Sequence, residues 1–133
     1  MEKQNIRKLL REGLTTKEYK EVTEFADFIN FAKSHLDIND DIKVMVVYER
    51  GDLITTAYYN LGGLIKVYGK GRGFIDICRS IAHELVHHKQ NLEGRLTDTA
   101  KQGEDGSEIE NEANAKAGVI IRKFGKAHPE IYN

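Results

Sequence analysis

The sequence predicts an α+β domain in which three short strands lie between helical segments along the chain. Apolar residues recur every three or four positions in the helical segments, which is the period of an amphipathic helix. β-branched and aromatic residues gather in short runs in the strand segments. The helical segments are residues 2–12, 16–36, 74–92 and 107–125, and the strand segments are residues 42–48, 53–59 and 64–68.

Length and composition limit what the chain can be. Its 133 residues are 40% hydrophobic and 31% charged, which fits a single domain spanning residues 1–133. The net charge of -1 gives no broad basic surface, so we expect no nucleic-acid partner. No apolar run approaches the ~20 residues of a membrane span, and the first residues form no apolar signal segment. Since Cys78 is the only cysteine, we expect no intramolecular disulfide, which agrees with a reducing compartment. We therefore expect a cytoplasmic protein without membrane attachment. We also expect it to be a monomer.

Two helices are expected before the strands. Three apolar residues stand at helical spacing ahead of Gly13, which predicts a short helix over 2–12 that ends at this glycine. From Thr15 or Thr16, either of which can cap a helix, an amphipathic pattern runs to about residue 36. We interpret both helices as scaffold.

The strand segments predict a three-stranded, mainly antiparallel sheet. Gly51-Asp52 separates the first segment from the second, and residues 60–63 separate the second from the third. Connections this short favour an antiparallel meander, in which each strand pairs with the next one along the chain.

The last two helical segments have different characters. Segment 74–92 is apolar around much of its girth, so we expect it in the middle of the domain, with Cys78 as a small core residue. A polar loop follows it. Ser107 then stands three residues before Glu110, which is the spacing of a capping box, and we expect this last helix to end at Gly125.

One motif on the central helix carries chemistry. His83-Glu84-Leu85-Val86-His87 is an H-E-x-x-H sequence, and residues four apart lie on one face of a helix, so both imidazoles can reach one metal ion. Two imidazoles and a third protein ligand leave one position open for water, whose pKa zinc lowers toward about 7. Glu84 is then the candidate general base. The alternative is a pair of core histidines satisfied by the backbone or by water.

The last helix supplies candidates for the third ligand. Glu110 and Asn114 are one turn apart and therefore face the same partner. Glu108 and Glu112 are alternative ligands, and Glu110 could instead serve only the capping box with Ser107.

These residues resemble the gluzincin metallopeptidases, the thermolysin-like group, in which a glutamate on a following helix completes the H-E-x-x-H site. The resemblance implies a small zincin-like fold in which His83, His87 and Glu110 bind zinc. It also implies that Glu84 is the catalytic base and that Asn114 hydrogen-bonds the His83 ring from behind. The activity implied is zinc-dependent hydrolysis of peptide bonds in a peptide or protein substrate.

The Glu-x-x-Ala-Asn arrangement at 110–114 is most similar to a small intracellular branch of that group. This branch includes the repressor-cleaving and radiation-response metallopeptidases, and the minigluzincins match this chain in size. The branch usually has an aromatic residue two positions after the asparagine, where this chain has Lys116. Residues 81–90 also resemble small metallopeptidase-like proteins encoded by phages.

The resemblance further implies that residues 54–60 form an edge strand that pairs with an extended substrate; an ordinary edge strand is the alternative. Candidates for stabilising the transition state are His128 and three strand tyrosines, although a terminal histidine is more often a surface residue and strand tyrosines more often pack against the sheet. The tyrosines are Tyr58, Tyr59 and Tyr68. His88 is expected to point about 100° away from the ligand face, either supporting the ligand residues from outside or packing in the core.

Two other functions stay open. One is a metal-stabilised protein-interaction module without significant peptidase activity, and the other is a zinc hydrolase acting on a substrate other than protein. Glu84 discriminates the first from a peptidase, because a structural metal site has no use for that carboxylate.

Overall fold

The computed structural model describes residues 16–49, 51, 55–96 and 107–129, and the side chains from residue 25 onward. This part of the chain has an α+β fold of three helices and a three-stranded mixed sheet. The elements in chain order are α2 (Thr16–Leu36), β1 (Lys43–Val47), β2 (Ala57–Asn60), β3 (Leu64–Tyr68), α3 (Phe74–Leu92) and α5 (Glu108–Ala127). The helix expected over 2–12 and most of the polar loop before α5 lie outside the described residues.

The helices follow the predicted patterns closely. The bounds of α2 and α3 agree with those expected from the apolar period. Ser107 caps α5 as predicted, since its hydroxyl accepts a hydrogen bond from the Glu110 backbone N–H at 3.2 Å. The predicted end of α5 at Gly125 is wrong, because the helix continues to Ala127 and the His128 N–H still bonds to the Phe124 carbonyl at 2.9 Å.

The predicted meander, in which each strand pairs with the next one along the chain, is wrong. Its order is β1-β3-β2, with β3 antiparallel to β2 but parallel to β1. The strands still alternate in direction along the chain. However, β2 does not pair with β1, and β3 occupies the place between them.

Burial explains why β3 takes the central position. Ile65 and Val67 on β3 are fully buried, whereas the residues of β2 are partly buried or exposed. The strand with the most apolar inner face therefore lies in the middle, and β2 is left at an edge of the sheet, as expected for the described part of segment 54–60.

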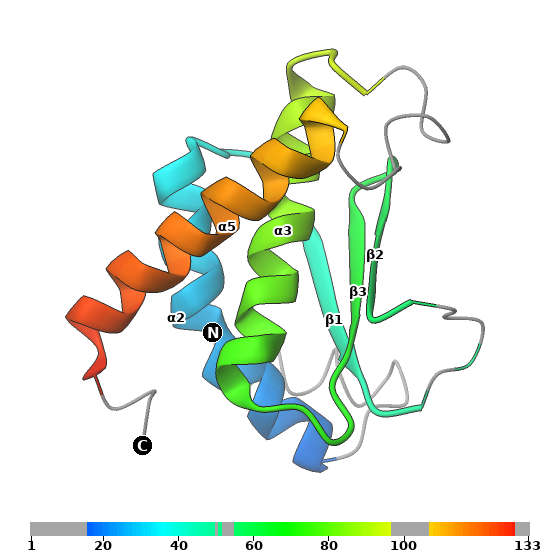
Figure 1. Ribbon diagram of the computed structural model, residues 1–133. Helices are drawn as coiled ribbons and strands as arrows, with labels where there is room; N and C mark the ends of the chain where they lie inside the picture. Colours follow the sequence, from blue (N-terminus) through cyan, green and yellow to red (C-terminus); the bar gives the residue numbers. More distant parts are fainter. Residues whose placement is uncertain (1–15, 50, 52–54, 97–106, 130–133) are drawn as a thin grey trace.

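Helix α3 organises the packing. It contacts α2, α5, β2 and β3, and Figure 1 shows it between α5 and the sheet. Its neighbours fill the core with aromatic pairs, such as the edge-to-face contact of Phe28 with Phe124, whose centroids are 5.1 Å apart. Cys78 is buried as predicted, and burial raises the pKa of its thiol to about 12. No helix in the described segments is long and apolar enough to span a membrane.

Candidate metal centre

Two histidines of α3 and one glutamate of α5 converge at the interface between these helices. The two carboxylate oxygens of Glu110 lie 2.9 Å from His83 Nε2 and 2.8 Å from His87 Nε2, and the two Nε2 atoms are 3.1 Å apart. The rings meet edge to face, with centroids 4.7 Å apart. The structure thus brings Glu110, rather than Glu108 or Glu112, to the histidines, and among the described residues this group could hold a metal ion.

Close packing of the helices makes this convergence possible. Ala113 and Ala117 on α5 are almost fully buried, and their small side chains allow its backbone to approach α3. Glu110 lies on the same side of α5, one turn before Asn114, so its carboxylate is directed at the H-E-x-x-H face. The Ser107 cap starts the helix at the position that this alignment needs.

The chemistry of the three groups fits a cation. His87 Nδ1 lies 2.8 Å from the Gln90 Oε1 acceptor, so Nδ1 carries a proton and Nε2 of the neutral ring presents a lone pair. That lone pair faces a carboxylate oxygen of Glu110, and two acceptors at 2.8 Å attract each other only when a proton or a metal ion lies between them. Imidazole nitrogen and carboxylate oxygen are both ordinary ligands of divalent transition metals.

His83 is suited to bind as a neutral ligand. Burial lowers the pKa of its imidazole below the ordinary value, and the neighbouring charge of His87 lowers it further, against the opposite effect of Glu110. Asn114 lines the pocket beside His83, and its side chain acts to raise the pKa of the His83 ring, the smallest of the effects on that pKa.

Glu84 lies beside the histidines in a buried setting. Only 8% of its surface is exposed. Burial, together with the negative charge of Glu110, raises the pKa of its carboxyl to about 8. Such a carboxyl can take up a proton near neutral pH, which is the property of a general base.

A pocket of about 370 Å³ opens at this point. Its lining comes from the start of β2, the approach to α3, α3 itself and α5: Thr56, Ala57, Arg72, Asp76, Arg79, Ser80, His83, Glu84 and Asn114. The Arg72 guanidinium is held by the carbonyls of Tyr68 and Asp76 at 2.8 and 2.9 Å and by the Ser80 hydroxyl at 2.7 Å. Arg79 is more exposed and lies only 3.9 Å from Asp76.

All five residues expected at the site are therefore near one another, with Glu84 and Asn114 in the pocket wall. No protein-family model, curated protein or solved structure matches this chain. A proposal for the function of this protein therefore rests on the geometry of the site.

The candidate transition-state donors do not reach the pocket. His128 caps the far end of α5, roughly 27 Å along the helix from Glu110, and its ring stacks on Phe124. Tyr58 is exposed, and its hydroxyl accepts a hydrogen bond from Asn60. Tyr59 and Tyr68 are also not among the pocket-lining residues. The structure therefore does not support the prediction that one of these four residues stabilises the transition state at this pocket.

Tyr59 belongs instead to a buried polar group around His88. Its hydroxyl lies 2.7 Å from His88 Nδ1 and accepts a hydrogen bond from Asn91 at 3.1 Å. His88 Nε2 lies 2.8 Å from the Asp40 carboxylate. His88 thus points away from the metal ligands, as predicted, and ties β2 and the β1 approach to α3.

Sequence reasoning missed a second group, behind His87. Gln90 contacts this ring, and Arg95 and Glu112 form a two-pronged ion pair beside it. Arg95 lowers the pKa of Glu112 to about 2. Gln90 could have been found from its place one turn after His87, but the Arg95 contact depends on a chain reversal that no periodic pattern reveals.

Proposed function

We propose that this protein is a zinc metallopeptidase of the gluzincin type. The observation that carries the proposal is the convergence of His83, His87 and Glu110 from two helices, with atoms of each pair 2.8–3.1 Å apart. Two histidines and a carboxylate gathered within reach of one another form a group that could hold a metal ion. The buried Glu84 next to the cluster separates a catalytic site from a structural one.

The set of ligand groups favours zinc. Ligand atoms about 2.0–2.1 Å from tetrahedral zinc lie about 3.3 Å from one another, close to the observed separations. Two histidines and one glutamate are a known catalytic zinc set, with a position left for water or substrate. Bound zinc would supply a Lewis acid for the peptide carbonyl and lower the pKa of the attacking water.

The residues of the chain perform the remaining steps. Glu84 accepts the proton of the attacking water and delivers it to the leaving amine. The positive charge of bound zinc would lower the pKa of Glu84 from its metal-free value of about 8, so that the carboxylate can take up the proton. Asn114 and Gln90 hold the two histidine rings, so that their Nε2 atoms stay directed at Glu110.

An extended peptide fits the approach to this site. β2 lies at an edge of the sheet, and Thr56 and Ala57 at its start line the pocket. A substrate backbone added along that edge would reach the histidines. Arg72 and Arg79 place positive charge in the same pocket, where it can stabilise a carbonyl oxygen as negative charge develops.

The test combines metal analysis with cleavage of a mixed peptide library, followed by mass spectrometry. Four proteins are compared: wild type, Glu84→Gln, Glu110→Ala and the control Glu108→Gln, which alters an exposed glutamate of the same helix. We expect one zinc in wild type, Glu84→Gln and the control, and loss of zinc in Glu110→Ala. Peptides should be cleaved by wild type and the control, and at least 100-fold more slowly by Glu84→Gln.

Two results would count against the proposal in different ways. If wild type holds zinc yet cleaves nothing that Glu84→Gln leaves intact, the site is not a peptidase, and a metal-stabilised interaction module becomes the better account. If wild type binds no zinc, the metal assignment itself fails.

A further inference from the structure

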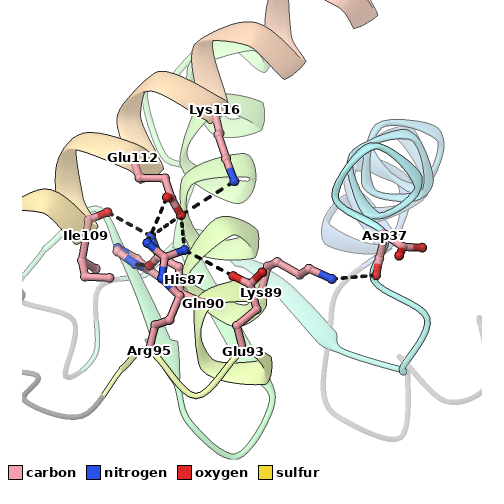
Figure 2. Close-up of polar contacts among 9 residues, drawn as sticks. All are labelled: Asp37, His87, Lys89, Gln90, Glu93, Arg95, Ile109, Glu112 and Lys116. Carbon is pink, nitrogen blue, oxygen red and sulfur yellow. Dashed lines mark hydrogen bonds and ion pairs between the residues drawn. The ribbon is translucent and has the colours of Figure 1, made fainter.

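Gln90 is a fully buried polar side chain with three contacts (Figure 2). Its Oε1 lies 2.8 Å from His87 Nδ1. Its Nε2 donates to the Ile109 carbonyl at 3.1 Å and to Glu112 Oε1 at 3.0 Å. A buried amide with both ends bonded is held in one orientation, because turning it over would leave buried polar atoms without partners.

The partners of Gln90 fix which end faces His87. A backbone carbonyl is an acceptor, and Glu112 is a carboxylate paired with Arg95 through two contacts of 2.8 and 3.0 Å. Turning the amide over would place its oxygen against both acceptors. The nitrogen therefore faces α5, and the oxygen faces His87.

The end of α3 builds this arrangement. Gly94 has a φ of 73°, and its N–H bonds to the Asn91 carbonyl at 3.0 Å, while the Arg95 N–H bonds to the Gln90 carbonyl at 2.9 Å. This glycine-based helix end reverses the chain. Arg95 is thereby brought back to Glu112, which in turn orients Gln90.

We propose that Gln90 is the positioning residue of His87: its oxygen keeps the proton on Nδ1, so that Nε2 points its lone pair toward Glu110 as a ready metal ligand. Arg95 and Glu112 act through Gln90 by fixing its amide. The inference rests on the proposed function only in requiring that the cluster binds a metal ion, and it is independent of which substrate is cleaved. Neither its sequence position nor the H-E-x-x-H motif assigns this role to Gln90.

The first test needs no substitution. Long-range ¹H–¹⁵N spectra of the zinc-loaded wild type at pH 8 report which ring nitrogen of each histidine binds the metal and which carries the proton. We expect His87 as the Nδ1–H form. A His87 ring protonated at Nε2 instead would overturn the proposal.

The second test measures zinc affinity by competition with a chelator. Gln90→Leu removes the acceptor and should weaken binding 10–100-fold, with His87 becoming a mixture of both tautomers. Glu112→Ala keeps Gln90 but removes the carboxylate that orients its amide, and should give a smaller loss of affinity than Gln90→Leu. Lys89→Leu is the control, because Lys89 bonds the Asp37 carbonyl away from the cluster (Figure 2).

Unchanged zinc affinity in Gln90→Leu would contradict the proposal, as would a His87 ring that stays entirely in the Nδ1–H form in that variant. None of these readouts depends on peptide cleavage. A protein that behaves as expected here but cleaves nothing would refute only the peptidase proposal.

Discussion

Glu110 of α5 spans the two histidines of α3, with one carboxylate oxygen 2.8 Å from His87 Nε2 and the other 2.9 Å from that of His83. His83 and Glu110 are 27 residues apart in the sequence, and the three side chains come from two different helices. A cation bound among them cross-links α3 to α5. If the cluster binds a metal as proposed, metal binding and the packing of α3 against α5 would therefore be coupled.

Zinc should stabilise the protein, and Glu110→Gln should remove that stabilisation. Free zinc at 100 times its dissociation constant adds about 2.7 kcal/mol to the free energy of unfolding, because the unfolded chain does not assemble the site. Urea denaturation with zinc and with a chelator measures the difference. Equal stability of wild type under both conditions would show that the cluster does not bind the metal.

Glu84→Gln should stabilise the metal-free protein at pH 8 but not at pH 5. The folded-state pKa of Glu84 is raised from 4.5 to about 8. The contribution of this shift to the free energy of unfolding is therefore fully present below pH 4.5 and is lost as the pH rises toward 8. The carboxyl ionises readily in the unfolded chain but reluctantly when buried. At pH 8 we expect the free energy of unfolding of Glu84→Gln to exceed that of wild type by on the order of 2 kcal/mol. A gain of the same size at both pH values would refute this origin.

Gly94→Ala should cost about 1 kcal/mol in the metal-free protein. An added Cβ meets no atom within 4 Å, so the cost comes from the φ of 73°, which is unfavourable for residues with a side chain. Gly118→Ala is the matched control: the new Cβ also meets open space, but the position is helical, so a gain of about 0.5–1 kcal/mol is expected. Denaturation curves in which both substitutions shift stability in the same direction would contradict the account.

Tyr59→Phe should lower the free energy of unfolding by about 1–3 kcal/mol, because it leaves the buried His88 Nδ1 and the Asn91 amide without their shared hydroxyl. Tyr58→Phe on the same strand removes an exposed hydroxyl, and we expect a change within about 0.5 kcal/mol. Thermal unfolding compares the two. Similar losses in both variants would argue against a special role for the Tyr59–His88 contact.

Local patterns predicted much of the fold and the site. The bounds of α3, the Ser107 cap and the shared face of His83 and His87 all depend on helix geometry over a few residues, which the sequence carries directly. The choice of Glu110 came from a resemblance, and the structure places it at the histidines.

Longer-range relationships could not be read in this way. The short connections predicted pairing between strands that follow one another along the chain, whereas the structure places the more apolar β3 between β1 and β2. The Arg95–Glu112 pair depends on the reversal at Gly94 and on the packing of α5 against α3. His128 was a chemically reasonable donor, but helix length places it far from the ligands.

The most direct test of the central claim is X-ray absorption at the zinc edge of the wild-type protein loaded with one equivalent of zinc. The account predicts a spectrum with two imidazoles and further oxygen ligands at about 2.0–2.2 Å, and loss of this signature in Glu110→Gln. Sulfur at about 2.3 Å, or an unchanged spectrum in that variant, would contradict a site formed by His83, His87 and Glu110.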